Sequence, residues 1–170
     1  MRKILCILAL LAFSNIAIAR PANAFLLTDS SGNREITLTS SDTIELLVWS
    51  NYNPTSFDLK IEPQGSCILD QPTITATGRT PENDHVGLIE TNWEFSSSAD
   101  SGYLETGIAS PLATVDFHSD VPGDITLNLY SFDGSNWIGS NCIGITIHQI
   151  PEPMTMVFLG LGGLMLRRRK

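Results

Sequence analysis

ATVDFHSDVPGDITLNL, residues 113–129, is the clearest structural signal in this chain. In each half of the stretch apolar residues alternate with polar ones, the side-chain period of a strand that has one face on a core. Residues 120–123 separate the halves and contain a proline and a glycine, which favour a turn. The stretch therefore predicts two short strands. Their core-facing positions are Ala113, Val115, Phe117, Ile125, Leu127 and Leu129.

The same alternation recurs on both sides of this stretch, and helical spacing is scarce. Turn-forming residues separate the runs at 29–33, 51–54 and 62–65, and Asp133-Gly134 predicts a hairpin between antiparallel neighbours. Residues 96–101 (SSSADS) read as a loop. The pattern predicts an all-β fold, an antiparallel β-sandwich or jelly roll of eight or nine strands, over residues 25–150. Further core positions are Ile36, Leu38, Ile44, Leu46, Val48, Phe57, Leu59, Ile61, Ile74, Ala76, Trp93, Phe95, Ile143, Ile145 and Ile147.

The charge of the chain is unevenly distributed. The 170 residues carry a formal charge of −8, but seven of the ten basic residues lie outside residues 25–150. Within that range Arg34, Lys60 and Arg79 face seventeen acidic residues, which gives a formal charge of −14. Such a surface repels phosphate backbones, so we expect no nucleic-acid partner.

Residues 1–24, MRKILCILALLAFSNIAIARPANA, have the three parts of a signal peptide. Arg2 and Lys3 form the charged start, residues 4–13 form an apolar run, and small residues follow at cleavage spacing. Signal peptidase could cut after Ala19 or after Ala24. We prefer Ala24, because Pro21 would lie just after the earlier cut.

Residues 151–170 form a second membrane-directed segment, which reads PEPMTMVFLGLGGLMLRRRK. The apolar stretch 154–166 would make a helix of about 20 Å, against a hydrocarbon core of about 30 Å. This end resembles the PEP-CTERM sorting signals of exporting bacteria, in which a Pro-Glu-Pro motif, a short apolar helix and a basic tail are read by an exosortase. The resemblance implies transient insertion in the inner membrane, then transfer to the cell envelope or extracellular matrix. The matching residues are the sorting motif Pro151, Glu152 and Pro153 and the cytoplasmic basic tail Arg167, Arg168, Arg169 and Lys170.

Two cysteines, Cys67 and Cys142, remain after signal removal, in an oxidising destination where thiols tend to pair. A bridge between them would close a loop of about 75 residues and stabilise by up to about 4 kcal/mol in the chain-entropy model. We expect this disulfide, with two separately buried thiols as the alternative.

Residues 103–132, YLETGIASPLATVDFHSDVPGDITLNLYSF, resemble the later half of cohesin-type jelly rolls. The shared features are a glycine before Pro-Leu-Ala, a strand ending in Phe117-His118, and a Gly-Asp turn that leads into the run from Ile125. The matching positions are mainly hydrophobic and glycine residues, so the resemblance bears on the fold. Cohesins bind dockerin modules, which implies a protein partner.

Motifs of catalysis are absent from the sequence: there is no G-x-S-x-G, H-E-x-x-H, phosphate loop or C-x-x-C pair. We therefore expect no catalytic residues and no metal centre, although oxygen-rich stretches at 29–33 and 120–124 could offer ligands to Ca²⁺. Three aromatic residues in or near loops are candidates for stacking on sugars, namely Trp137, Tyr52 and Tyr103.

Our leading functional hypothesis is an exported, non-enzymatic envelope or matrix protein whose sandwich mediates adhesion or scaffolding, with a cohesin-like protein partner as its specific form. The first alternative is a carbohydrate-binding module for an envelope or matrix polysaccharide. A secreted hydrolase comes last, because no pair of carboxylates stands out.

Overall fold

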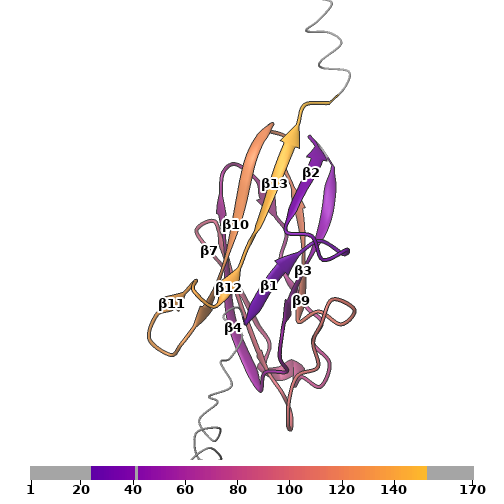
Figure 1. Ribbon diagram of the computed structural model, residues 1–170. Coiled ribbons are helices and arrows are strands. Elements are labelled where there is room, and N and C mark those ends of the chain that lie inside the picture. The colour runs from indigo at the N-terminus through magenta and orange to yellow at the C-terminus, as the bar shows by residue number, and fades with distance from the viewer. Residues whose placement is uncertain (1–23, 41, 153–170) are drawn as a thin grey trace, which may run out of the picture.

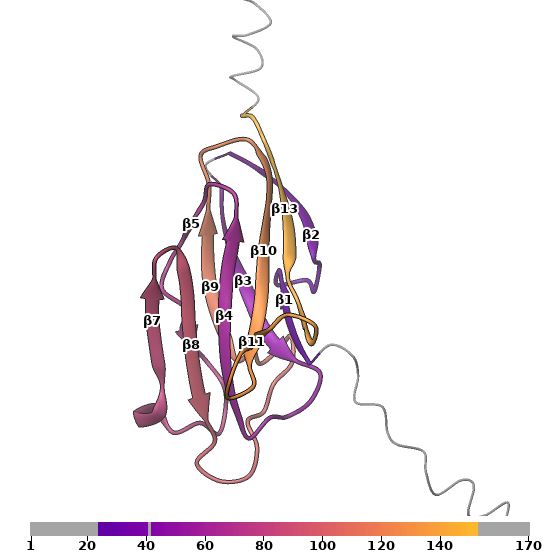
Figure 2. The same cartoon turned by 90° about the vertical axis from the view of Figure 1, so that its left-hand side faces the viewer.

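The computed structural model describes residues 24–40 and 42–152 of the chain. Within these ranges the protein is a sandwich of two β-sheets, and Pro81–Asn83 forms a short 3-10 turn. Figures 1 and 2 show the long strands of both sheets running roughly along the length of the molecule. The prediction of an all-β sandwich is confirmed, while the signal peptide and the C-terminal apolar helix lie outside the described residues.

Each sheet has one or two long central strands and short edges. The six-stranded sheet has the order β12-β1-β3-β9-β5, with β6 also paired to β9, and the seven-stranded sheet has the order β2-β13-β10-β4-β8-β7, with β11 also paired to β10. The strands of the first are β1 (Phe25–Thr28), β3 (Thr43–Ser50), β5 (Ile68–Leu69), β6 (Thr73–Ile74), β9 (Ala113–His118) and β12 (Cys142–Ile143). Those of the second are β2 (Glu35–Thr39), β4 (Ser56–Gln64), β7 (His85–Ile89), β8 (Asn92–Ser98), β10 (Gly123–Phe132), β11 (Trp137–Ile138) and β13 (Ile145–Ile150).

The stretch 113–129 forms β9 and most of β10, which belong to opposite sheets. The turn between them carries the chain across the sandwich, so the apolar faces of the two strands meet in the same core. All six alternating apolar residues are buried there. Most of the other predicted core positions fill the core from both sheets, and Phe57 of β4 packs edge-on against Phe95 of β8, with ring centroids 6.2 Å apart. Trp93 and Ile143 are exceptions, because both are only partly buried and lie outside this core.

The two ends of the domain run side by side and change sheets together. β1 pairs in parallel with β12 in the six-stranded sheet, and β2 pairs in parallel with β13 in the seven-stranded sheet. The crossing from β12 to β13 is a single residue, Gly144. Its backbone lies so close to the Leu127 carbonyl of β10 that a Cβ atom has no room.

The serine-rich segment predicted as a loop is partly strand, because β8 extends through Ser98. Ser97 is buried, and its Oγ donates a hydrogen bond of 2.6 Å to Oδ1 of Asp84. The second carboxylate oxygen of Asp84 accepts a 2.8 Å hydrogen bond from Arg79. Ser97 therefore holds the segment around Asp84 against β8. The serine-rich composition of residues 96–101 alone does not indicate this role.

The predicted disulfide between Cys67 and Cys142 is wrong, since both thiols are free. Cys142 lies in β12 at one edge of the six-stranded sheet, and Cys67 directly precedes β5 at the other edge. Neighbouring strands are about 4.8 Å apart, so three intervening strands put the two edges about 19 Å apart, whereas bridged Cα atoms lie within about 7 Å. Both side chains are half-buried, and burial raises the pKa of each thiol.

The described chain enters the sandwich at one end and leaves it at the other. β1 starts at the lower end in Figure 1, and β13 finishes at the upper end. The loops that follow β3 and β10 lie at the lower end, with the start of β1. A tether at the C-terminal end would therefore leave these loops at the far end of the sandwich.

Ala24 belongs to the folded domain, because its backbone makes three hydrogen bonds. Its N–H donates to the Asn141 carbonyl at 2.6 Å, and its carbonyl accepts from the Ser50 hydroxyl and the Asn51 N–H at 2.7 and 3.1 Å. We expect a chain that begins at Phe25 to be less stable than one that begins at Arg20 by about 1.5–4.5 kcal/mol, since three such bonds are lost and each contributes about 0.5–1.5 kcal/mol net. Urea denaturation of both proteins measures this, and a chain that begins at Ala24 is the control. Equal midpoints for all three would contradict it.

Candidate functional site

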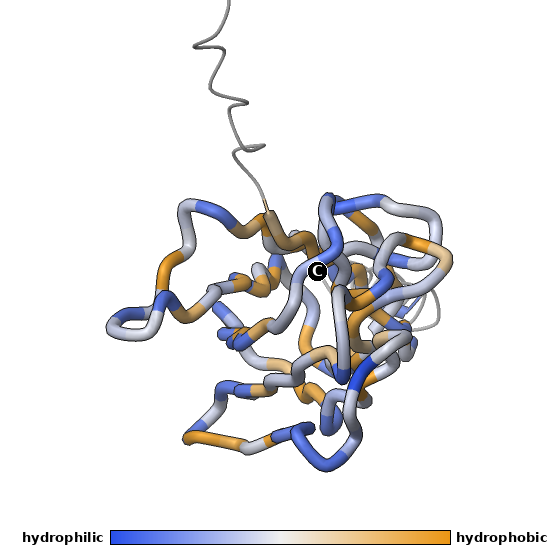
Figure 3. The backbone as a smooth tube through the Cα atoms, turned by 90° about the horizontal axis from the view of Figure 1, so that it is seen from below, coloured by the Kyte–Doolittle hydropathy of each residue, from blue (hydrophilic) through white to orange (hydrophobic). Residues whose placement is uncertain are grey.

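A hollow of about 320 Å³ is lined by segments that lie at the lower end of the sandwich in Figure 1. Its walls come from the start of β1, the loop after β3, the start of β4 and the end of β10. We call it the end hollow, and it is lined by Ala24, Phe25, Tyr52, Ser56, Phe57, Asp58, Ser131, Phe132, Asp133 and Asn141. Figure 3 looks along the sandwich from this end and shows hydrophilic stretches concentrated in the peripheral loops.

Two aromatic rings of the end hollow are substantially exposed, Tyr52 at 46% and Phe132 at 39%. Each is held by another ring. Tyr52 lies against Phe25 with centroids 5.9 Å apart, and Phe132 lies against Trp137 with centroids 5.3 Å apart. These contacts fix the orientation of both exposed rings before any ligand arrives.

Two carboxylates share the end hollow and differ in their surroundings. Burial raises the pKa of Asp58, and the charge of nearby His85 acts in the opposite direction. The pKa of Asp133 is lowered, because its Oδ1 accepts hydrogen bonds from the N–H groups of Asn136 and Ser135, each at 2.8 Å. These bonds also close the turn of the predicted hairpin, in which Phe132 pairs with Trp137.

A second group of aromatic residues lies on the outer face of the seven-stranded sheet. The ammonium of Lys60 on β4 lies over the ring of Tyr130 at 4.8 Å and over that of Trp137 at 5.4 Å. It also forms a 3.3 Å ion pair with Glu62, and the Lys60 side chain is only 15% exposed. We call Lys60, Tyr130 and Trp137 the lysine–aromatic cluster. Its cation is fixed by two ring faces and one carboxylate, an arrangement that preorganises the surface.

The three aromatic candidates from the sequence occupy different places. Tyr52 lines the end hollow, and Trp137 supports Phe132 of that hollow with its ring while contributing to the lysine–aromatic cluster. Tyr103 is 66% exposed and is not among the residues that line the hollow. Sequence reasoning missed Lys60, Asp58, Tyr130 and Phe132. Lys60 carried a usable signal, as the one lysine of residues 25–150 within an alternating run.

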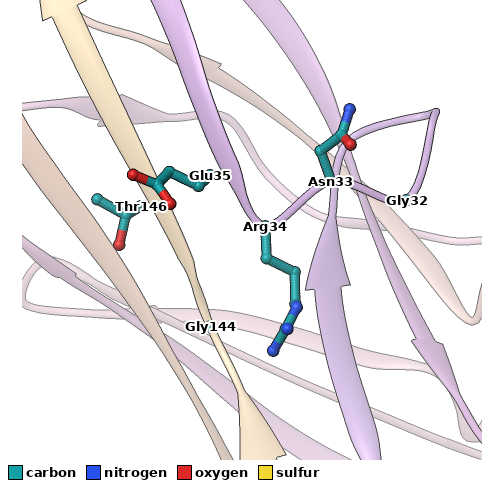
Figure 4. Close-up of a pocket in the computed structure, with 6 residues that line it drawn as sticks. All are labelled: Gly32, Asn33, Arg34, Glu35, Gly144 and Thr146. Atoms are coloured by element: carbon teal, nitrogen blue, oxygen red, sulfur yellow. The ribbon is translucent and has the colours of Figure 1, made fainter.

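A polar depression of about 510 Å³ lies where β1 passes into β2 beside Gly144. Figure 4 shows Arg34 pointing toward Gly144 and Glu35 pointing toward Thr146. Glu35 is already engaged, because it accepts from Nε2 of His148 at 3.0 Å. This depression follows from the crossing of the terminal strands between the sheets.

The oxygen-rich stretches do not converge into a cation site. Burial acts to raise the pKa of Asp29, but hydrogen bonds from Asn33 and Ser31 outweigh it and lower the pKa. Asp120 and Asp124 each pair with a histidine. Among the described residues no group of three or more His, Cys, Asp or Glu side chains could hold a metal ion.

His148 joins three strands on the outer face of the seven-stranded sheet. Its Nδ1 lies 2.7 Å from Asp124 on β10, and its Nε2 lies 3.0 Å from Glu35 on β2. The hydrogen bonds to Asp124 and Glu35 raise the pKa of His148. Because the protonated ring binds both carboxylates, its stabilising effect is complete below the unfolded pKa near 6.5 and disappears as pH rises through the raised folded pKa.

We therefore expect His148→Gln to lower the melting temperature at pH 5.5 and to have a much smaller effect at pH 8.5. Melting curves of the parent protein and the variant at both pH values measure this effect. The difference in melting temperature between the two proteins is compared at each pH, so that the titration of other acidic groups, common to both, cancels. A gap between the two proteins that widens with rising pH would contradict the pairing.

Pro151 and Glu152 follow β13 directly, so the proposed sorting motif begins where the last strand stops. Pro153 and the basic tail Arg167, Arg168, Arg169 and Lys170 lie outside the described residues, as does the apolar stretch 154–166. In the part of the chain that the structure describes, we find no helix with the length and hydrophobicity needed to cross a bilayer.

No family model and no curated protein matches the chain. Solved structures are similar in fold. A cohesin module from a Clostridium perfringens family 33 glycoside hydrolase is 12% identical, with a TM-score of 0.55 over 78% of this chain and 100% of that one. A non-cellulosomal cohesin from the archaeon Archaeoglobus fulgidus is 11% identical, with a TM-score of 0.52 over 79% and 96%. The C-terminal domain of the Streptococcus pyogenes antigen I/II-family protein AspA is 14% identical, with a TM-score of 0.51 over 76% and 47%. The cohesin-type fold expected from residues 103–132 is thereby confirmed, and identities this low speak to the fold alone.

Proposed function

We propose that this chain is an exported, non-enzymatic binding protein for adhesion or scaffolding, and that it holds a protein partner on the outer face of its seven-stranded sheet. The observation that carries the proposal is the lysine–aromatic cluster on that face. Tyrosine and tryptophan are the residue types that most often dominate the binding energy of protein interfaces. Here they are half-buried and fixed in place, so a partner loses little entropy by docking on them.

The size of this face suits a protein partner. Its six main strands are about 4.8 Å apart and average seven residues, or about 23 Å, in length, which gives a surface of roughly 550 Å². A typical stable complex buries about 800 Å² on each partner. A face of this size favours a macromolecule over a small substrate.

The negative charge of the domain limits the kind of partner that it can attract. Residues 25–150 carry a formal charge of −14, and Lys60 is already paired with Glu62. A partner with cationic side chains around its contact surface would be attracted, and an acidic one repelled. The similarity of fold to cohesin modules supports a dockerin-like module as the specific form of this partner, because cohesins bind dockerins.

Export and sorting complete the proposal. Residues 1–24 would direct the chain out of the cytoplasm, and residues 151–170 would be read by an exosortase-type enzyme before the domain reaches the envelope or matrix. The exit of β13 at the upper end supports this proposal. Attachment of the domain at that end would leave both the sheet face and the end hollow accessible. The native product is expected to lack the signal peptide and to end near Pro153. Intact mass spectrometry tests this, and a product that keeps Met154 to Lys170 would overturn the sorting step.

The binding surface is tested by capture of proteins from the extracellular fraction of the producing organism. Lys60→Glu reverses the central charge and removes the cation from both rings, and we expect it to lower capture of the specific partner about tenfold. Arg34→Glu is the matched control, since it makes the same charge change at an exposed turn. Capture that survives Lys60→Glu, that falls equally in both variants, or that persists after the fraction is treated with protease would refute a protein partner on this face.

A further inference from the structure

The end hollow has the chemistry of a sugar site, which is a different ligand class from the partner proposed for the sheet face, although the two surfaces share Trp137. Sugar rings present C–H groups on their flat faces and hydroxyl groups around their edges. A site for them therefore needs exposed aromatic rings beside hydrogen-bonding groups. Tyr52 and Phe132 supply the rings, and both are already oriented by Phe25 and Trp137.

Polar groups line the hollow together with these two rings. Asp58 and Asp133 offer carboxylate oxygens as acceptors, and acceptors that carry charge make the stronger hydrogen bonds. Asn141 adds a side-chain amide, and Ser56 and Ser131 add hydroxyl groups. The hollow thus combines apolar faces with both donors and acceptors.

The charge of the hollow selects the class of sugar. Two of the residues that line it are acidic, and none of the described lining residues is basic. Uronic acids, sulfated sugars and phosphorylated glycans would be repelled by Asp58 and Asp133 and by the acidic domain around them. A volume of about 320 Å³ is at the lower end of the range of about 300–1,000 Å³ for small-ligand pockets, which suits one or two sugar units.

We propose that the end hollow binds one or two units of a neutral, uncharged polysaccharide, with Tyr52 and Phe132 stacking on the sugar faces and Asp58 accepting hydrogen bonds from sugar hydroxyls. The segments that line the hollow lie at the lower end of the sandwich, opposite the end where β13 finishes. A chain of sugars could therefore continue past the hollow into the surrounding matrix. The protein would then connect its own attachment point to the polysaccharide.

Affinity electrophoresis of the native exported protein tests the proposal. Gels contain laminarin, hydroxyethyl cellulose, xylan or dextran as neutral probes, and alginate as the acidic probe. We expect at least one neutral probe to retard the protein and alginate to leave it unretarded. Tyr52→Ala and Phe132→Ala should each weaken binding about tenfold, in keeping with about 1.4 kcal/mol per lost stacking contact.

Tyr103→Ala is the matched control, because Tyr103 is also a tyrosine and is more exposed than Tyr52, but lies outside the lining of the hollow. Asp58→Asn provides a second variant with an unchanged shape, and it should also weaken binding. The proposal is overturned if no neutral probe retards the protein, if alginate retards it as strongly, or if Tyr103→Ala weakens binding as much as Tyr52→Ala. Because Trp137 contacts both Lys60 and Phe132, the two proposals are separated through Tyr52, which lines the hollow but is not part of the lysine–aromatic cluster: Tyr52→Ala should weaken sugar binding and leave protein capture unchanged.

Discussion

Gly144→Ala is expected to destabilise the domain by more than about 3 kcal/mol or to prevent folding. The new Cβ would overlap the carbonyl oxygen of Leu127 and would lie 3.2 Å from the Cα of Asn128. Both neighbours are backbone atoms of β10, a central strand held by β4 and β13. No flexible side chain can move aside, so either β10 or the crossing of β12 into β13 must shift.

Chemical denaturation of the purified domain measures this loss, and circular dichroism reports whether the sheets form at all. Gly107→Ala is the control, because a Cβ at Gly107 meets no atom within 4 Å. We expect that variant to remain within about 1 kcal/mol of the parent protein. A Gly144→Ala protein as stable as Gly107→Ala would show that the end segments do not cross between the sheets at this residue.

The strands were predictable because their information is local. The alternation of apolar residues such as Ile125, Leu127 and Leu129 with polar ones indicates a strand with one face against a core, whichever residues make up the rest of that core. The structure buries all three. Loop and strand were confused where polar residues serve a tertiary purpose, as Ser97 does when it donates to Asp84, and at residues 62–64, which were expected in a turn but extend β4.

Pairing between distant strands was not predictable, and it decides both the cysteines and the site. Nothing local places Cys67 and Cys142 at opposite edges of one sheet, which is why the expected disulfide failed. In the same way Lys60 meets Tyr130 only because β4 and β10 are neighbours in that register. The residue types suggested recognition by aromatic rings. Which residues contact each ring could be known only from the order of the strands in the sheet.

The end hollow illustrates the same limit. Tyr52 was a candidate from its loop position alone, and the sequence offered no reason to place it beside Phe132, which lies 80 positions later. Phe132 is out of phase with the buried positions Ile125, Leu127 and Leu129 of β10, so the alternation places it on the outward face of the strand. Its exposure follows from this phase, and its neighbour there is Trp137, which pairs with it across the hairpin.

Phe95→Ala is expected to cost about 3–5 kcal/mol, the usual range for a fully buried phenylalanine. Phe95 of β8 is 0% exposed, packs edge-on against Phe57 and faces the centre of the core. Its removal leaves a cavity between two sheets that cannot close without moving β4. Because a domain of this size has a total stability of about 5–15 kcal/mol, the variant should unfold at a much lower denaturant concentration.

Phe132→Ala is the matched comparison, since it makes the same change on a ring that is 39% exposed. It removes only the contact with Trp137, and we expect a loss of about 1 kcal/mol. Urea titration of both variants beside the parent separates the two roles. If Phe132→Ala were as destabilising as Phe95→Ala, the ring would belong to the core, and a loss of polysaccharide binding in that variant would report unfolding. A small cost shows that the ring is held at the surface by the fold without being needed for it, as a residue kept for a ligand should be.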